Sequence, residues 1–538
     1  MANTFFGMTI AGSGLAASNI SINTTAHNIA NVNTEGYSRQ VANTSPAVGI
    51  RVYNTHGTVG TGIAVNSIDQ LRSSYYDTKY WNNSAIYGEY TTLERYSLMA
   101  EDYLDEFTLE GFMTEYDNFF NTINALCNDP TSDVARNQFV NYGLSLCNYF
   151  NTLSTNLADI QKSANDEVKT TVDSINTIAE QIASLNKQIN VIEINGGEAN
   201  DLRDNRALLV DELSKYINTA VTEHDVGGGA TEFIVYINDQ ILVDTYSYNS
   251  IICEAREAGD RRNASDIDGL YKLKWNNGLI FNVYSSAMHG SLKAAVDFRD
   301  GCNSGYEILG MVDENGEFYR NAEGDIARVY DLTEEEYNDL VAQGYKKDIT
   351  LVVDPYRNSV YKGIPFYQQQ INEFISTFAD AVNSTIKGDN QDVADFITNL
   401  YGESYITADN ATINPEIIKD ISLLPYSYDP TQGAANVDMV TALRELKEQV
   451  IINNGTFGDY LSSIVSVVGI DSKRATTFSR NYDNIRQTIN NQRLSISGVD
   501  EDEEAVDLVK FQNAYQLSSK VINVMQQIYS KLIEETGI

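Results

Sequence analysis

Hydrophobic residues near the C-terminus recur at alternating intervals of three and four, the spacing of a heptad repeat. A helix with this spacing presents one apolar seam to a partner helix. A second apolar row lies beside the first, so the helix can be covered on more than one side. The first row is Phe511, Ala514, Ser518, Val521, Met525, Ile528 and Leu532, and the second is Leu508, Tyr515, Ile522 and Tyr529.

The first 32 residues repeat this heptad pattern with smaller side chains. Ser, Thr, Asn, Ala and Gly dominate the segment, so its intrinsic helix propensity is low and the isolated helix would be marginal in water. We therefore expect the two ends of the chain to pair as one coiled coil that folds against a partner; the alternative is a frayed terminus. The predicted N-terminal seam is Met8, Leu15, Ile22 and Ile29, with Ala11, Ser18, Thr25 and Val32 between them.

Between the termini, helical periods alternate with strand periods. Gly, Asn, Asp and Pro separate them, as expected for turns and helix ends. The predicted helices begin near residue 71, break at Asp129–Pro130, and cover 150–193, 200–217, 333–343 and most of 364–494; the predicted strands lie within 41–70, in 232–244 about an Asn238–Asp239 turn, and in a pair within 273–283 about Asn276–Gly278.

These elements predict an α+β multidomain protein with a terminal α-helical coiled coil, a core bundle of long helices, and β-rich outer domains inserted into it. The predicted domains are a terminal assembly domain of residues 1–70 with 495–538, a helical core of 71–217 with 364–494, a β-rich domain of 218–300, and a small α+β module of 301–363.

Composition narrows the possible functions. The net charge of −37 over 538 residues argues against nucleic acid or an anionic membrane as a partner. No apolar run approaches the ~20 residues of a membrane span. The first Lys or Arg is Arg39, so the N-terminus lacks the charged region of a secretory signal. We expect either a cytoplasmic protein or one that is exported without cleavage.

The residues offer little material for catalysis. The cysteines and histidines are widely spaced, and no metal-binding, nucleophile-base or phosphate-loop motif is present. We therefore expect no enzyme activity, no cofactor and no metal. The acidic segment at Asp313–Gly316 is read as a hairpin turn rather than a calcium loop, and the acids of Asp500–Glu504 as a helix start. The cysteines are Cys127, Cys147, Cys253 and Cys302, and the histidines His27, His56, His224 and His289.

Two motifs flank the terminal seams. The first follows the N-terminal helix, where asparagines and Gly36 permit a left-handed turn and Tyr37 can anchor the exit. The second precedes the C-terminal helix, where Gly498 frees a turn and carboxylates complement the helix dipole. Their residues are Asn28, Asn31, Thr34, Gly36 and Tyr37 in the first, and Ser497, Gly498, Val499, Asp502, Glu503 and Glu504 in the second.

These motifs resemble those of axial flagellar proteins, and the second, followed by Phe511–Tyr515, resembles the hook-associated protein 1 family in particular. The resemblance continues through Met113–Arg136, Asn200–Asp204 and Gly290–Asp300. The chain departs from the family pattern in 301–363, which we interpret as an outward-facing insertion, and at Glu501, where the family often has an apolar residue.

The resemblance implies a structural subunit at the joint between flagellar hook and filament, extracellular and exported unfolded through the flagellar type III channel. The implied partners are a ring of like subunits, the hook protein, hook-associated protein 3 on the filament side, and an export chaperone at the C-terminal helix, with no nucleic acid or membrane. Two alternatives stay open, namely a flagellin or other hook-associated subunit, and an accessory adhesin function in residues 219–363 through exposed Tyr side chains or Trp275.

Overall fold

A computed structural model describes most of the chain, and helices predominate alongside several small sheets, which confirms the predicted α+β class. The chain divides into two compact units: the first comprises Met1–Tyr87, Ser174–Ser250 and Asn481–Ile538, and the second Gly88–Asp173 and Ile251–Arg480. The four domain boundaries drawn from the sequence stay predictions. The described residues are 6–52, 57–109, 112–257, 260–285, 287–301, 306–321, 324–352, 362–390, 392–401, 405–429, 431 and 436–536.

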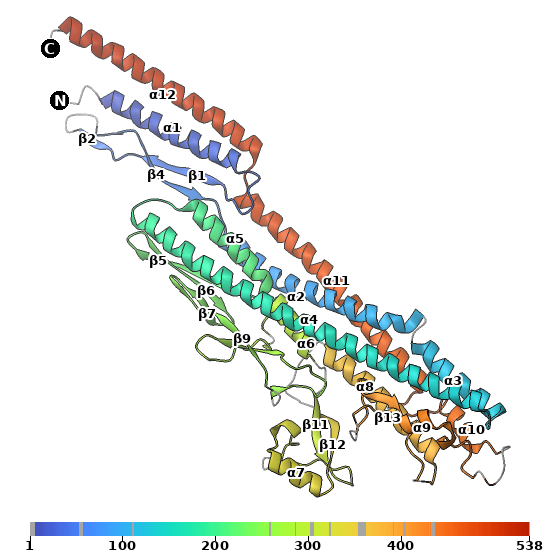
Figure 1. Cartoon of the computed structure of the whole chain (residues 1–538). Coiled ribbons are helices and arrows are strands. Elements are labelled where there is room, and N and C mark those ends of the chain that lie inside the picture. The colour runs from blue at the N-terminus through green and yellow to red at the C-terminus, as the bar shows by residue number, and fades with distance from the viewer. Residues whose placement is uncertain are drawn as a thin grey trace. The chain divides into compact units, whose positions relative to one another are not determined.

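In the first unit the two ends of the chain lie side by side (Figure 1). Helix α1 (Phe6–Ala30) runs antiparallel to helix α12 (Glu501–Thr536). After α1, strand β1 (Gln40–Pro46) pairs with β4 (Ile63–Gln70), and β2 (Ile50–Val52) pairs with β3 (Gly57–Val59). These hairpin pairings confirm the strands expected within residues 41–70.

The first unit also contains helix α5 (Asn200–Tyr216) and a four-stranded antiparallel sheet. The Asn238–Asp239 turn between β6 and β7 is confirmed, and both residues adopt positive φ angles, 47° and 62°. Such a turn matches the twist of its flanking strands. The sheet consists of β5 (Ala220–Gly227), β6 (Ala230–Ile237), β7 (Gln240–Asp244) and β8 (Ser247–Tyr248) in that order.

Three long helices contribute residues to both units: α2 (Ser74–Leu109), α4 (Asp133–Ile194) and α11 (Phe457–Ser497). The helix predicted over 150–193 is therefore correct but begins earlier, at Asp133. The predicted break at Asp129–Pro130 separates α4 from the helix before it, α3 (Phe112–Asn128). Helix α3 ends there because proline cannot donate the next backbone hydrogen bond of a helix. Among the described residues, no helix combines the length and apolarity that a bilayer crossing requires.

Aromatic rings form the core of the helical part of the second unit. Phe119, Phe139, Phe374, Phe378 and Phe457 are fully buried and contact one another with centroid distances of 5.0 to 5.8 Å. Such ring pairs add to the stabilisation from buried area. The remaining elements of this part are α8 (Ile364–Lys387), β13 (Ile397–Asn399), β14 (Ala411–Ile413), α9 (Pro415–Lys419), η3 (Ile421–Leu423) and α10 (Asp438–Glu445).

The β-rich part of the second unit differs from the sequence prediction in one pairing. Strand β10 (Tyr271–Trp275) pairs with β9 (Ile251–Ala255), whereas the expected partner after the Asn276–Gly278 turn makes only an isolated bridge from Lys274 to Ile280. The local turn is present, but the ladder forms with the preceding strand of the chain rather than with the residues after the turn. Trp275 is 5% exposed and packs against Phe281. It therefore offers no surface for the stacking that the adhesin alternative considered.

Helix α6 (Ser291–Asp300) ends at a buried charge cluster in the second unit. Asp300 bonds Arg256 at 2.5 Å and Arg299 at 2.7 Å. Burial opposes the charge of Asp300, yet the two arginines hold its pKa below the usual range. The cluster stabilises the return from the β-rich part into the helical part.

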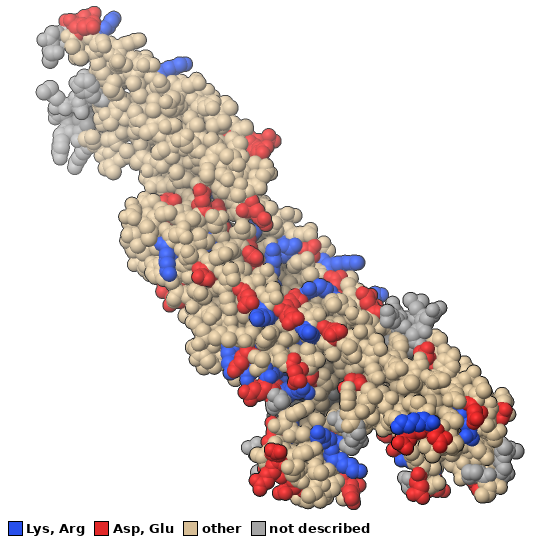
Figure 2. Space-filling view, in the orientation of Figure 1, with Lys and Arg blue, Asp and Glu red and all other residues tan. Residues whose placement is uncertain are grey.

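The small inserted module contains β11 (Tyr306–Val312) paired with β12 (Lys346–Val352), the short η2 (Val329–Asp331) and α7 (Glu334–Ala342). Asp313 accepts hydrogen bonds from the backbone N–H groups of Asn315 and Glu317, and Gly316 has a φ of +82°. These features confirm the expected turn. Figure 2 shows both acidic and basic side chains over the visible face of this module.

Candidate functional site

The two family motifs meet in the first unit, and we call their meeting place, residues 28–40, 493–504 and helix α5, the terminal joint. Helix α1 ends at Ala30, and the chain then turns at Gly36, whose φ is +79°. A Cβ at Gly36 would lie 3.3 Å from Cβ of Leu208, so glycine suits both the backbone conformation and the available space. The turn directs Tyr37 back toward α1 and Arg39 toward α12.

Asn28 is the polar centre of the terminal joint and is 1% exposed. Its Oδ1 accepts hydrogen bonds from the Tyr37 hydroxyl at 2.8 Å and from the Gln40 backbone N–H at 3.0 Å. Its Nδ2 donates to the Gln40 carbonyl at 2.9 Å and to Glu504 Oε2 at 3.1 Å. All four hydrogen bonds of the amide are made, so burial leaves no polar atom of this side chain unpaired.

Glu504, in the first turn of α12, is 2% exposed and binds both sides of the joint. Its Oε1 accepts a hydrogen bond from Arg39 Nε at 2.6 Å, while Oε2 accepts from Asn28. The same guanidinium lies 3.1 Å from Glu503 Oε2 and 3.6 Å from Asp507 Oδ2. A buried carboxylate needs such partners because desolvation of an unpaired charge is costly.

The passage from α11 to α12 is a tight turn. The Arg39 backbone N–H donates to the Ser497 carbonyl at 2.8 Å, which ties the N-terminal motif to this turn. At Gly498, a Cβ would lie 2.5 Å from the Leu494 carbonyl oxygen, so no other residue fits without a backbone shift. Asp500 then caps α12, accepting from the backbone N–H groups of Asp502 and Glu503. The acids here are a helix start.

Helix α5 supplies two buried carboxylates to the terminal joint. Asp204 accepts a hydrogen bond from the Ser38 backbone N–H at 3.0 Å and lies 3.6 Å from Arg72. Asp211 is bound by Arg493 at 2.7 Å and by the Trp81 indole at 2.6 Å. Burial raises the pKa of both carboxyls, while the arginines and hydrogen bonds favour their charged forms.

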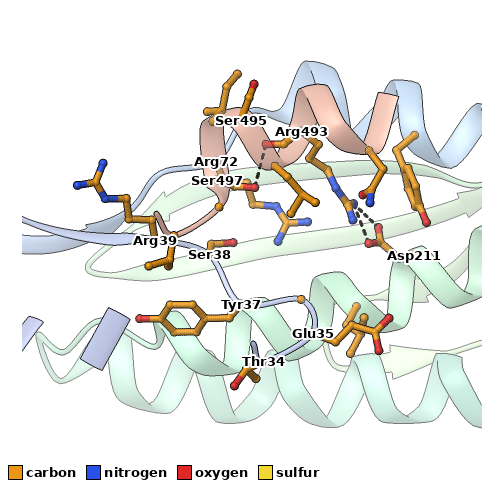
Figure 3. A pocket seen from close by; sticks show the side chains of 18 of the residues that line it. Thr34, Glu35, Tyr37, Ser38, Arg39, Arg72, Asp211, Arg493, Ser495 and Ser497 are labelled. Atoms are coloured by element: carbon orange, nitrogen blue, oxygen red, sulfur yellow. Dashed lines mark hydrogen bonds and ion pairs between the residues drawn. The ribbon is translucent and has the colours of Figure 1, made fainter. Parts of the chain in front are cut away.

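A groove of about 950 Å³ lies between these elements, and Figure 3 shows the side chains that line it. On one side of the groove, Arg493 and Asp211 point toward one another. On the other side lies the segment that contains Tyr37, Ser38 and Arg39. In the described part of the chain, no three His, Cys, Asp or Glu side chains are placed to hold a metal ion. The polar groups mostly satisfy one another, which suits a structural connection.

The N-terminal seam residues lie beside the most buried line of α1. Met8, Leu15, Ile22, Ile29 and Val32 are half-buried. Glycines on this helix face α12: a Cβ at Gly7 would contact Met525, and one at Gly14 would contact Ser518. Close helix approach therefore depends on small residues. The buried residues of α1 are Ala11, Ala17, Ser18, Ser21, Thr24, Thr25 and Asn28.

The C-terminal seam residues of α12 differ in exposure. Leu508, Phe511, Ile522 and Met525 are half-buried. By contrast, Tyr515, Val521, Ile528 and Leu532 are exposed, with Tyr515 at 37% and Ile528 at 48%. Val521, Ile528 and Leu532 lie on the opposite side of the helix with further exposed apolar residues, and we call this set the outer stripe of α12: Val506, Val509, Leu517, Val521, Val524, Ile528 and Leu532. Figure 2 shows few charged side chains on the visible face over α1 and α12.

Of the motif residues, Asn28, Gly36, Tyr37, Ser497, Gly498 and Glu504 come together in the terminal joint, while Thr34, Asp502 and Glu503 are exposed and Asn31 and Val499 are half-buried. Sequence reasoning missed Arg39 and the α5 carboxylates. Arg39 carried a signal, since it is the first basic residue of the chain and the C-terminal motif is acidic. Asp204 lies in the segment Asn200–Asp204 that carries the resemblance, but nothing in the sequence marks Asp204 or Asp211 as buried, because both fit the solvated face of an amphipathic helix.

Comparison with protein families places three models along the chain in order. Residues 8–37 match the model described as "Flagella basal body rod protein", residues 99–350 "Flagellar hook-associated protein FlgK helical domain", and residues 490–535 "Flagellar basal body rod FlgEFG protein C-terminal". The two outer matches include the halves of the terminal joint that α1 and α12 contribute.

Similar proteins match along the whole chain. "Flagellar hook-associated protein 1" of Bacillus subtilis is 25% identical over 548 residues, covering 100% of this chain and 99% of the relative. The Escherichia coli protein of the same name is 24% identical over 572 residues, covering 97% and 98%. The solved structure of the flagellar hook junction protein FlgK from Burkholderia pseudomallei aligns with a TM-score of 0.48 and 11% identity, over 78% of this chain and 100% of that one. On the sequence comparisons, the chain is similar along its whole length to flagellar hook-associated protein 1, and the family model of its helical domain matches the middle of the chain.

Proposed function

We propose that this protein is a structural subunit of the bacterial flagellum that joins the hook to the filament. Full-length similarity supports this role, because the relatives that match the whole chain carry the name of a hook-associated protein. No catalytic step is part of the proposal. Its immediate partners would be further copies of the same chain in a ring, the hook protein on one side and hook-associated protein 3 on the other.

The outer stripe of α12 is the observation that carries an assembly role. Leu517 is 62% exposed, Val524 53% and Ile528 48%. Burying such side chains stabilises an assembly by ~25 cal/mol per Å² of apolar surface. Contiguous exposed apolar surface on one helix is typical of a protein interface. Neighbouring subunits would cover the stripe in the assembled flagellum, and an export chaperone would cover it beforehand.

Folding of the terminal helices would be coupled to incorporation. Helix α1 buries mainly small and polar side chains, so its contact with α12 provides limited apolar burial. Ordering costs ~1–2 kcal/mol per residue in backbone entropy alone. Contacts with neighbouring subunits would offset the remaining cost, and the unpaired termini would suit export as an unfolded chain through the flagellar type III channel.

Immunogold electron microscopy of intact flagella tests this function. An epitope inserted in the exposed turn at Glu314–Asn315 should be labelled at a single point between hook and filament. The same epitope at the exposed Asn276–Asn277 turn is the matched control for accessibility. Labelling along the entire filament would instead identify a flagellin-type subunit, and filaments that attach normally in a strain lacking the chain would contradict a junction role.

A further inference from the structure

Three contacts define the alignment of α1 against α12. Gly7 faces Met525, Gly14 faces Ser518, and Asn28 bonds Glu504. From the first contact to the second, the position moves seven residues forward on α1 and seven back on α12. From the second contact to the third, the position again moves forward on α1 and back on α12, this time by fourteen residues on each helix. The contacts therefore repeat at whole heptads along one antiparallel interface.

The small and apolar residues do not by themselves select this alignment. A displacement of one heptad would place Gly14 opposite Met525, the residue that Gly7 faces now. Elsewhere on the buried side of α1 the side chains are Ala, Ser and Thr, which give few shape constraints. A periodic seam of small residues fits itself equally well after a seven-residue shift.

The polar pair does distinguish the two alignments. After a one-heptad displacement Asn28 would lie opposite Phe511, and Glu504 would lose its bond to Asn28. Both residues are almost fully buried, so unmet hydrogen bonds would carry their full desolvation cost. A single buried polar side chain is the best-attested means of fixing the register of paired helices.

We propose that Glu504 determines the register of the α1–α12 pair and that Asn28 and Arg39 are the groups that recognise it. Asn28, on α1, donates a hydrogen bond to the Glu504 carboxylate, and Arg39, in the segment that follows α1, donates another. The alternative is that the short connections at residues 31–39 and 498–500 set the register alone. The alignment concerns two helices of one chain and stands independently of the proposed function.

A disulfide competition on the purified full-length chain measures the register. With Gly14→Cys, Ser518→Cys and Met525→Cys together, the cysteine at position 14 can bond either 518, the native alignment, or 525, the shifted one. An ideal Cβ at Gly14 lies 3.9 Å from Ser518 Cβ, within the range for a disulfide. In a thiol–disulfide redox buffer, peptide mapping gives the ratio of the two bonds. The ratio compares two paired states, so it is readable even where pairing is transient.

Glu504→Ala should lower the ratio of native to shifted bond by about tenfold, because the selecting carboxylate is gone. Glu503→Ala is the matched control: its carboxylate contacts the same Arg39 guanidinium but is 61% exposed, so the ratio should stay within about twofold. Transferring the carboxylate by one heptad, with Glu504→Ala and Phe511→Glu, should reverse the preference, since Asn28 then meets its partner in the shifted alignment.

Two results would overturn the proposal. An unchanged ratio in Glu504→Ala, with no reversal in the transfer variant, would mean that the connections set the register. Loss of both disulfides in Glu504→Ala and in the transfer variant would mean that Glu504 stabilises pairing without selecting an alignment. Circular dichroism of each variant shows whether the rest of the chain has remained folded.

Discussion

Nη1 of Arg493 in α11 lies 2.9 Å from Oδ1 and 2.7 Å from Oδ2 of Asp211 in α5, so one nitrogen contacts both carboxylate oxygens (Figure 3). The Trp81 indole donates to the same carboxylate, and the Arg493 guanidinium lies 4.2 Å from the centroid of the Tyr80 ring. Within the first unit, this buried pair connects α11, which leads into the C-terminal motif, to α5, which contacts the N-terminal motif.

Arg493→Met should destabilise the first unit by about 3–5 kcal/mol, because Asp211 would remain buried without its cation. Adding Asp211→Asn should recover part of that loss, since no unpaired charge is then left. Urea unfolding checks this in a Trp275→Phe background, where Trp81 is the only tryptophan and reports on the first unit. As control, Lys510→Met removes the 68%-exposed partner of Asp507 and should cost at most ~1 kcal/mol. Equal losses in the two single variants would argue against the buried-charge explanation.

Gly498→Ala should weaken the turn between α11 and α12 by about 1–3 kcal/mol, because the added methyl meets the Leu494 carbonyl oxygen. Gly12→Ala should have the opposite sign. A Cβ there meets nothing within 4 Å, and alanine in a helix interior is favoured over glycine by about 0.5–1 kcal/mol. Hydrogen exchange of peptides covering 494–504 and 8–20 measures both effects. Exchange that is faster in both variants, or unchanged in both, would contradict the different surroundings of Gly498 and Gly12.

Asp297 should give the second unit a pH-dependent stability. Burial raises its pKa to about 6, although the Lys293 ammonium, 2.6 Å away, opposes the shift; Glu89 and Asp300 raise it further. The unfolded carboxyl titrates near ~3.9, so between about pH 4 and 6 the folded state binds more protons than the unfolded state. Stability therefore falls as pH rises through this range and becomes level above it.

Asp297→Asn should remove that slope. Urea unfolding from pH 4 to 7 provides the measurement in a Trp81→Phe background, where Trp275 is the only tryptophan and reports on the second unit. Asp268→Asn, which changes a carboxylate that is 84% exposed, should keep the wild-type profile. Parallel profiles for Asp297→Asn and wild type would exclude Asp297 as the source of the pH dependence.

The two faces of α12 should respond differently to a charge. Leu517→Asp, on the outer stripe, should leave the α1–α12 pair intact and block incorporation into flagella, because a neighbouring subunit would have to bury the carboxylate. Met525→Asp, opposite Gly7, should also disrupt the pair itself, and Ile522→Asp should resemble it. Epitope labelling at the junction measures incorporation, and the Gly14→Cys, Ser518→Cys disulfide measures pairing. Normal junctions in Leu517→Asp would remove the outer stripe as an interface.

Local chemistry made much of the fold predictable from the sequence. The proline after Asp129, the Asn238–Asp239 turn and the Asp313 turn occur where expected, because each depends on the backbone preferences of a few adjacent residues. The same holds for the stop after α1 and the start of α12. The heptad spacing likewise indicated that the terminal segments are helices with apolar seams.

Only the tertiary structure decided which residues meet. The strand that pairs with β10 is β9, sixteen residues before it, rather than the expected strand beyond the adjacent turn. On α1, Gly7 and Gly14 face the partner helix, while Met8 and Leu15 are half-buried beside them. Asp204 and Asp211 became buried charges only when Ser38 and Arg493 were brought to them. Sequence periodicity sets which side of an element is apolar, whereas alignment, closeness and charge pairing depend on atoms that distant parts of the chain supply.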